Sequence, residues 1–555
     1  LAAGASTSGE VHYKVTLAKP LSNCSFTTGY VYYDHTGWSK PYVEPAEPTW
    51  TFPLPNGYYT SGWCICRNIG SSPHIGQDIA KSGTMRAVAV QKGRLTSTSY
   101  SSSCGYISYL EDDYADNVTN SNEEEEDSES PPSSEAVLSG EDLDDFHFSE
   151  STEDFLERRN SAARSGYGVS ILAFSNTPPR DYRVRYTEPN SPASEVVNGQ
   201  ANFERGTRIL SVDGVDLVNG GSSQSEIDTL NDGLFPATAG ETHVFEVQDP
   251  GASSSRTVTI TSADVAQAPV NRTGVIDTSS GKVGYILFNT FSPFSSEEAI
   301  ANAITDMSNE GVTDLVLDLR YNGGGLLAVA GQLSYMIAGP TRTDGKTFEQ
   351  LQFNSNAGNT NPVTGATNGP IPFYNTGLGF SLANGTPLDN LNLGRVFILS
   401  TPRTCSASEA VINGLRGIDV EIVLIGSITC GKPYGFYPTD NCGQTYYTIQ
   451  FRGVNDKGFG DYSDGFVPNN SSFAFGERVS GCVVSDDFTK ELGDPTEGLL
   501  AAALDYRENG TCPSISTKLE ADTVYAKPGL SEVATTTRTE PEDVLANNRD
   551  MTMPW

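Results

Sequence analysis

The sequence predicts an α/β fold that follows β-rich regions. Apolar runs typical of buried strands alternate with helix-like runs between residues 275 and 512, whereas short strands of alternating polarity dominate the first 110 residues. With 555 residues the chain is too long for one hydrophobic core, so several domains are expected. The chain contains no run of about 18 apolar residues, and we therefore expect no transmembrane helix.

Composition divides the chain into five segments. They are a β-rich accessory region over 1–110, an acidic low-complexity linker over 111–150, a helix with a β-rich domain over 151–270, an α/β core over 275–512 and an extended tail over 513–555. The linker is highly charged and poor in apolar residues, so it is not expected to fold by itself.

The elements of the core follow from its hydrophobic pattern. Continuous apolar runs predict buried strands, and apolar residues that recur every three to four positions predict helices. The predicted strands cover 283–291, 315–317, 394–400 and 421–426. The predicted helices cover 296–311, 406–418 and 494–509, and a short amphipathic helix is predicted earlier, over 152–163.

The charge of the chain restricts its partners. Acidic residues number 69 against 35 lysines and arginines, which gives a net charge of −34. Nucleic acid is excluded as a partner because phosphate binding requires basic patches. We interpret the acidity as a means of staying soluble in a salty or extracellular medium.

A serine and a lysine stand at positions where each could acquire unusual reactivity. The segment "TCSASE" (404–409) opens a predicted helix, and "TCGKP" (429–433) follows a predicted buried strand. Ser406 would lie at a helix N-terminus, where backbone N–H groups favour developing negative charge. Burial would lower the pKa of Lys432, so that its neutral amine could take the serine proton.

These two motifs resemble those of the C-terminal processing (tail-specific) serine proteases, which read T-A-S-A-S-E and T-F-G-K-G. The resemblance implies a crotonase-like core, with Ser406 as nucleophile and Lys432 as general base. It also implies that the glycine turn in "DLRYNGGG" (318–325) and the residue after the nucleophile supply the oxyanion N–H donors. These donors are Ala407 and Gly324, with Gly323 as the alternative if the turn is shifted.

The chain departs from the family pattern after the lysine. Phe436 stands where the family usually has a glutamine that orients the lysine. Another group must then take that role, and Gln444 and Gln450 are candidates.

Residues 166–265 resemble a PDZ domain. The segment "SGYGVSI" (165–171) is similar to the loop and strand that receive a peptide carboxylate, and "GTRILSVDGVDL" (206–217) matches a second pattern of that family. The resemblance implies peptide binding by the backbone of Gly166, Tyr167, Gly168 and Val169, through addition of a strand to a sheet edge.

The first region has a fainter resemblance to lysostaphin-type zinc endopeptidases. His74 and Asp78 match the H-x-x-x-D spacing of two zinc ligands in that family. The later H-x-H of the family is missing, and catalytic zinc needs three protein ligands. We therefore predict a β-rich accessory domain and expect no metal or other cofactor.

Nine cysteines predict disulfides formed in an oxidising compartment. Spacing allows Cys430–Cys442 and Cys482–Cys512, and it equally allows Cys405 to pair with Cys430 and so tie Ser406 to Lys432.

The opening "LAAG" resembles the end of a bacterial signal segment. It predicts an exported protein that is periplasmic, on the outer surface or extracellular. A lipid anchor upstream of the given chain is left open.

The sequence therefore predicts an exported serine endopeptidase of the tail-specific type. Its partners would be protein or peptide substrates, held with the help of the PDZ-like region and cleaved by a Ser–Lys dyad. Two alternatives remain at this point. One is a catalytically inactive peptide-binding protein of the same fold, and the other is a cell-wall hydrolase that acts through the N-terminal module.

Overall fold

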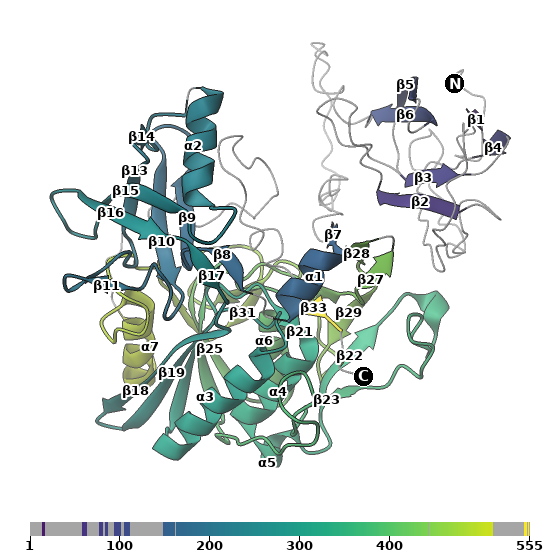
Figure 1. Cartoon of the computed structure of the whole chain (residues 1–555). Coiled ribbons are helices and arrows are strands. Elements are labelled where there is room, and N and C mark those ends of the chain that lie inside the picture. The colour runs from purple at the N-terminus through teal and green to yellow at the C-terminus, as the bar shows by residue number, and fades with distance from the viewer. Residues whose placement is uncertain are drawn as a thin grey trace, which may run out of the picture. The chain divides into compact units, whose positions relative to one another are not determined.

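The computed structural model describes residues 148–160, 163–221, 223–441, 443–513, 549–551 and 553, together with six short strands in the first 111 residues (Figure 1). The chain divides into two compact units. One contains residues 1–143, 149–152 and 439–446, and the other contains 144–148, 153–438 and 447–555. Within the described residues, no helix combines the length and apolar character needed to cross a bilayer.

The first unit contains short antiparallel strand pairs. β1 pairs with β4, β2 with β3, and β5 with β6. The bounds are β1 (Lys14–Thr16), β2 (Tyr58–Trp63), β3 (Gln77–Ala80), β4 (Thr84–Arg86), β5 (Arg94–Ser101) and β6 (Gly105–Glu111). A three-stranded sheet orders β27 (Thr439–Asn441), β28 (Gln444–Tyr447) and β7 (Phe148–Ser151). The predicted linker over 111–150 lies almost entirely outside the described residues.

A small antiparallel sheet opens the second unit, after helix α1 (Thr152–Arg159). Its strand order is β16 (Arg256–Thr261), β15 (Thr242–Gln248), β13 (Arg208–Val212), β10 (Asp181–Thr187) and β9 (Val169–Ser175), with β14 (Val215–Asp216) beside β13. Helix α2 (Gln224–Leu234) packs on it. Two strand pairs accompany the sheet, β8 (Arg164–Gly166) with β17 (Ala263–Val265), and β11 (Val196–Val197) with β12 (Gln200–Ala201).

The large sheet of this unit is mostly parallel. Its order is β18 (Val270–Thr278), β19 (Gly281–Phe288), β20 (Asp314–Asp318), β24 (Arg395–Ser400), β25 (Glu421–Gly426) and β32 (Gly481–Val483), and only β18 runs antiparallel. The central strands are continuous apolar runs because helices cover both faces. The predicted strands of the core are confirmed within a few residues.

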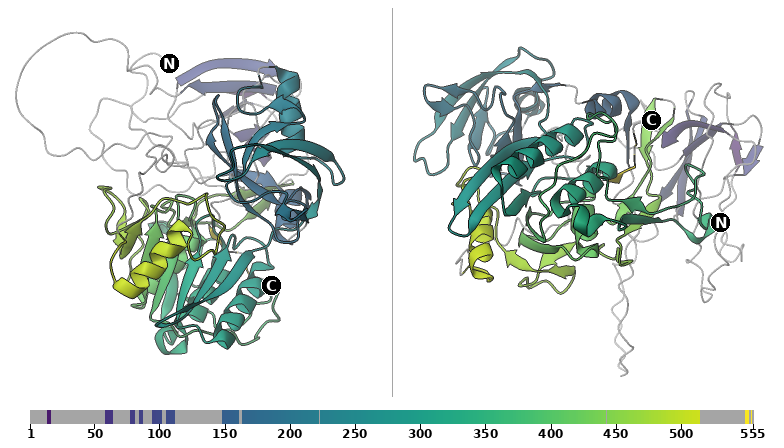
Figure 2. Two further views of the ribbon diagram at one scale, coloured as in Figure 1. Left: turned by 90° about the vertical axis from the view of Figure 1, so that its left-hand side faces the viewer. Right: turned by 90° about the horizontal axis from the view of Figure 1, so that it is seen from below.

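Helices cover the two faces of this sheet unequally. α3 (Ser296–Glu310), α4 (Leu327–Ala338) and α6 (Ala407–Gly417) pack on one face, and α7 (Gly498–Asn509) packs on the other (Figures 1 and 2). Neighbouring residues of one strand point to opposite faces, as in β19, where Ile286 packs with the first group and Leu287 with the second. The predicted α/β architecture and its three core helices are confirmed.

Smaller elements lie around the C-terminal ends of these strands. A four-stranded sheet orders β23 (Ile371–Pro372), β22 (Thr347–Gln352), β29 (Phe451–Val454) and β26 (Tyr434–Gly435). β30 (Phe466–Pro468) pairs with β31 (Glu477–Val479), and β21 (Gly325–Leu326) pairs with β33 (Arg549–Asp550). The short helices are α5 (Pro340–Thr343) and the 3₁₀ helix η2 (Ser355–Ala357).

A buried charge network fixes the end of β20. Arg320 has no exposed side-chain surface, and its guanidinium forms ion pairs with Asp318, Asp486 and Glu497. Asp486 also binds Arg205 of the small-sheet domain at 2.7 Å. The network therefore joins the small-sheet domain to the strand that leads into the glycine turn at 323–325.

Candidate active site

Ser406 lies at a sharp turn between strand β24 and helix α6. Its backbone has φ 59° and ψ −110°, a left-handed conformation that costs a non-glycine residue about 1–3 kcal/mol. Such a conformation persists only where neighbouring contacts enforce it. The Cys405 N–H donates to the Asn322 carbonyl at 3.0 Å, and the Ser408 hydroxyl donates to the same oxygen at 2.9 Å. These bonds hold the turn against the loop that follows β20.

Lys432 lies in the loop that follows strand β25. It is fully buried, and this desolvation lowers the pKa of Lys432 to about 7, although the nearby Glu409 carboxylate opposes the shift. The ammonium nitrogen lies 5.1 Å from the centre of the Phe436 ring. Near neutral pH a substantial fraction of this lysine is therefore an uncharged amine, which can accept a proton.

The buried carboxylate of Glu409 holds the serine turn and the lysine loop together. It accepts hydrogen bonds from the backbone N–H groups of Ser406 at 3.0 Å, Gly431 at 2.9 Å and Lys432 at 2.8 Å. The Thr429 hydroxyl donates to it at 2.6 Å. Burial raises the pKa of Glu409, and these hydrogen bonds oppose that rise. Sequence analysis assigned no role to Glu409, although the Ser-x-x-Glu spacing at a helix start is a capping-box signal.

A disulfide joins the same two loops covalently. Cys405 and Cys430 are bonded, with their Cα atoms 5.2 Å apart, so the residue before Ser406 is tied to the loop that ends in Lys432. The predicted Cys430–Cys442 pairing is wrong because Cys430 is already bonded, and the predicted Cys482–Cys512 bond is confirmed.

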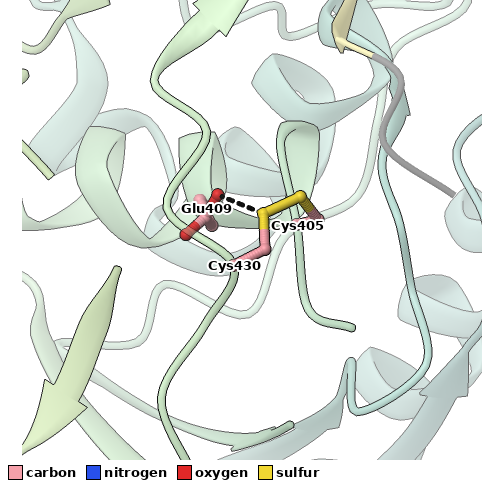
Figure 3. Close-up of side chains that lie close together, drawn as sticks. All are labelled: Cys405, Glu409 and Cys430. Carbon is pink, nitrogen blue, oxygen red and sulfur yellow. Dashed lines mark hydrogen bonds between the residues drawn. A yellow bond between two sulfur atoms is a disulfide. The ribbon is translucent and has the colours of Figure 1, made fainter. Parts of the chain in front are cut away.

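Glu409 packs against this disulfide (Figure 3). Its carboxylate lies 3.3 Å from the Cys430 sulfur, a contact rather than a hydrogen bond because a disulfide sulfur bears no proton. The three side chains are close enough together to hold a metal ion. In the disulfide-bonded form, however, the sulfurs cannot act as thiolate ligands.

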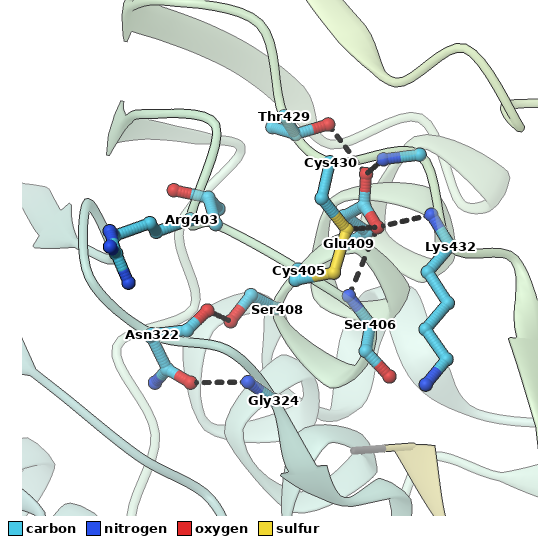
Figure 4. Close-up of a disulfide and its surroundings, with 12 residues drawn as sticks. Asn322, Gly324, Arg403, Cys405, Ser406, Ser408, Glu409, Thr429, Cys430 and Lys432 are labelled. Carbon is cyan, nitrogen blue, oxygen red and sulfur yellow. Dashed lines mark hydrogen bonds between the residues drawn. A yellow bond between two sulfur atoms is a disulfide. The ribbon is translucent and has the colours of Figure 1, made fainter. Parts of the chain in front are cut away.

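Figure 4 shows the Ser406 hydroxyl and the Lys432 amine ending on the same side of the disulfide. Both side chains are fully buried. The Ser406 hydroxyl makes no hydrogen bond within the part of the chain that the structure describes, so it is not yet bonded to Lys432. Catalytic hydrogen bonds are often formed only when substrate is bound.

The expected oxyanion donors differ in their availability. Ala407 is the first residue of α6, and its N–H has no acceptor within that helix. The Gly324 N–H instead donates to the Asn322 side-chain oxygen at 2.9 Å, so the structure shows this predicted donor already bonded. Gly323, the alternative, donates its N–H to no acceptor among the described residues.

The two glutamines suggested as substitutes for the family glutamine serve other groups. The Gln450 side-chain oxygen accepts the Tyr437 N–H at 2.8 Å, and the Gln444 amide donates to the neighbouring Gly443 carbonyl at 3.4 Å. Glu409 and Phe436 do contact Lys432, through its backbone N–H and its amine respectively. The sequence did not indicate these two roles, because the Glu409 contact joins segments that are distant in the chain and the Phe436 contact lies across a turn.

The residues expected to bind peptide lie at one edge of the small sheet. Gly168 precedes β9, the edge strand that Val169 begins, and a side chain at Gly168 would collide with Ser191. The Tyr167 side chain is buried in the domain core and donates to the Gly233 carbonyl at 2.9 Å, so only its backbone could face a peptide. The backbone of Gly166 is engaged in the β8–β17 pair.

His74 lies outside the described residues, and Asp78 is described only as part of the backbone of β3.

Comparison with known proteins identifies part of the chain. Residues 282–438 match peptidase family S41. The chain is 36% identical over 179 residues to a carboxyl-terminal-processing protease of Picosynechococcus sp.. It is 28% identical over 192 residues to a chloroplastic C-terminal processing peptidase of Tetradesmus obliquus. These matches cover 31% and 33% of this chain, and 38% and 39% of the relatives.

A solved structure supports the fold. The crystal structure of a putative S41 protease from Bacteroides fragilis superimposes with a TM-score of 0.50 at 22% identity, over 69% of this chain and 93% of that protein. The glycine turn, the serine turn and the lysine loop all lie inside the matched range of the family. The part of this chain that is similar to peptidase family S41, residues 282–438, therefore contains the whole candidate active site.

Proposed function

We propose that the protein is a serine endopeptidase in which Ser406 is the nucleophile and Lys432 the general base. The observation that supports this most is the pair of loops at the site. A fully buried lysine with a pKa of about 7 and a serine at a helix N-terminus are held together by one disulfide and by one carboxylate. The names of the two relatives suggest that polypeptide C-termini are among the substrates.

In this proposal the neutral Lys432 amine takes the proton of Ser406 as the hydroxyl oxygen attacks the substrate carbonyl carbon. The negative charge that develops on the carbonyl oxygen is stabilised by the Ala407 N–H and by an N–H of the glycine turn. Gly323 is the better candidate there, because Asn322 already accepts the Gly324 N–H. The protonated lysine then donates to the leaving amine, and water hydrolyses the resulting ester.

Labelling with a fluorophosphonate tests this proposal without a known substrate. Such a reagent reacts with an activated serine, and activation requires the neutral lysine. The rate of labelling is therefore expected to rise with pH through about 7 and then level off. Peptide mass mapping should place the label on Ser406.

Matched lysine variants provide the control. Lys432→Met should remove the labelling, whereas Lys457→Met, which changes a lysine exposed on the surface, should leave it unchanged. A labelling rate that is flat from acidic to alkaline buffer would exclude Lys432 as the base. Absence of any label in the intact protein would favour the alternative of an inactive peptide-binding protein.

We further propose that the small-sheet domain is a PDZ domain that binds substrate C-termini at β9. β9 is an edge strand, and Gly168 directly before it has a φ of 71°, a conformation that favours glycine. An extended peptide can pair with such an edge through main-chain hydrogen bonds.

The two disulfides also support our proposal that the protein is exported into an oxidising compartment. The S41 match supports our proposal of a crotonase-like core.

The carboxylate preference of this domain can be measured with the full-length Ser406→Ala protein. Calorimetry is expected to show that peptides with a free, apolar C-terminal residue bind more tightly than their amidated forms. Ile171→Asp on β9 should remove this difference, and Val244→Asp, at an exposed position of β15 in the same sheet, should preserve it. Equal affinity for acid and amide would show that the domain does not recognise the carboxylate.

A further inference from the structure

A segment from the far end of the chain lies in the candidate active site. This tail segment comprises the described residues 549–551 and 553. Its first two residues pair as β33 with β21, in parallel register that places Gly325 opposite Arg549 and Leu326 opposite Asp550. On its other side, the Met551 N–H donates to the Phe436 carbonyl at 3.3 Å. The tail segment is therefore bonded to two separate parts of the site.

These two parts are the walls of the catalytic centre. β21 begins directly after Gly324, in the glycine turn that offers oxyanion donors. Phe436 lies four residues after Lys432, and its ring faces the amine. In the view of Figure 4 a faint yellow ribbon, which has the colour of the tail segment, appears below the ends of Ser406 and Lys432. The tail segment therefore contacts both the glycine turn side and the lysine loop side of the site.

The side chains of the tail segment add apolar contacts. Met551 packs against the core cluster beneath α4. Met551 and Met553 face a small pocket whose other lining residues are Leu327, Ala328, Ile371 and Tyr374. An apolar lining favours an apolar side chain. An unbranched side chain such as methionine can also adapt its shape to an irregular space. The tail segment thus combines main-chain pairing with an anchored side chain, the two elements of strand-addition recognition.

The burial of the catalytic pair agrees with an occupied site. Neither Ser406 nor Lys432 has exposed surface, so a substrate can reach them only after some part of the site has moved. Among the described atoms, the tail segment contacts the site through the main chain of β33 and Met551 and through the side chains of Met551 and Met553.

We propose that the tail segment is an autoinhibitory strand that occupies the substrate position of the catalytic cleft. By the same geometry, a substrate pairs with β21 as an extended chain and places an unbranched apolar side chain at the position of Met551, beside Leu327 and Ile371. This inference rests on the proposed function, since it assigns the substrate position of the same site.

Removal of the tail segment should open the site to substrate. If the strand occupies the cleft in about nine of ten molecules, a chain that ends at residue 548 should show a KM for quenched fluorescent casein about tenfold lower than the full chain. Intact-mass measurement verifies that the full chain has kept its tail during the assay. Met551→Asp should reproduce the effect of truncation, because it puts a charge into the apolar pocket. Val197→Asp, at an exposed position of β11, is the matched control and should leave KM unchanged.

A binding measurement separates this inference from the proposed catalytic function. A fluorescent peptide with the sequence of residues 547–553 should bind the truncated Ser406→Ala protein and be displaced by casein, and the same peptide with aspartate in place of Met551 should bind at least tenfold more weakly. Binding without cleavage by any form of the protein would retain the autoinhibitory strand and reject the protease. An unchanged KM after truncation, with equal binding of both peptides, would overturn the inference.

Discussion

Replacement of Ser406 by alanine should lower kcat/KM for casein by roughly a thousandfold or more while leaving the fold intact. The hydroxyl oxygen is the atom that would form the ester, and alanine leaves no nucleophile at this position. Lys432→Met should cause a loss of the same order. The double variant should lose no more than either single variant, because nucleophile and base act as one unit.

Ser408→Ala is the matched control for the nucleophile. Ser408 lies two residues further along the same helix, and its hydroxyl donates to the Asn322 carbonyl. Its loss weakens the support of the turn but leaves the reacting atom in place, so its effect on kcat/KM should be much smaller. If Ser408→Ala abolished cleavage and Ser406→Ala did not, the nucleophile would be misassigned. Thermal unfolding curves of each variant show whether a loss of activity is a loss of fold.

Arg320→Met should produce the largest loss of stability. The Arg320 side chain has no exposed surface and neutralises Asp318, Asp486 and Glu497, of which Asp318 and Glu497 are themselves fully buried. Removing one partner from a buried ion pair leaves uncompensated charge and costs about 3–5 kcal/mol. Urea unfolding should show this decrease in the free energy of unfolding.

Arg452→Met is the control for this substitution. Arg452 lies at an exposed position of β29, where its guanidinium donates to Gln352. Loss of an exposed contact of this kind usually changes stability by less than about 1 kcal/mol. Equal destabilisation by the two variants would mean that the buried network contributes no more than a surface contact.

The sequence predicted those parts of the fold that depend on local patterns. The buried strands β20, β24 and β25 are continuous apolar runs, and α3 and α6 have helical spacing of apolar residues, so their types and approximate bounds could be stated in advance. The positions of the serine and lysine motifs after two such strands also followed from the pattern. Parallel neighbouring strands bring their C-terminal ends to one edge of the sheet, which accounts for the convergence of the two loops.

The remaining features of the site depend on contacts that no local pattern specifies. Three cysteines offered alternative pairings, and only the folded chain shows that Cys405 bonds Cys430. The bond from the Gly324 N–H to Asn322 reflects the shape of the glycine turn rather than its composition. The pairing of Arg549 with Gly325 joins residues more than two hundred positions apart, through a strand too short to be predicted from its own sequence.

The bond between Cys405 and Cys430 also acts on the unfolded chain. It closes a loop of sequence separation 25 that contains both α6 and β25. Restricting a loop of this size removes conformational entropy worth roughly 3–4 kcal/mol from the denatured ensemble. Even when the sheet and its helices have unfolded, the disulfide keeps Ser406 and Lys432 close together, because they lie one and two residues from the bonded cysteines. An oxidised chain therefore begins to refold with its two reactive residues already near each other, and only the surrounding sheet and helices still have to form.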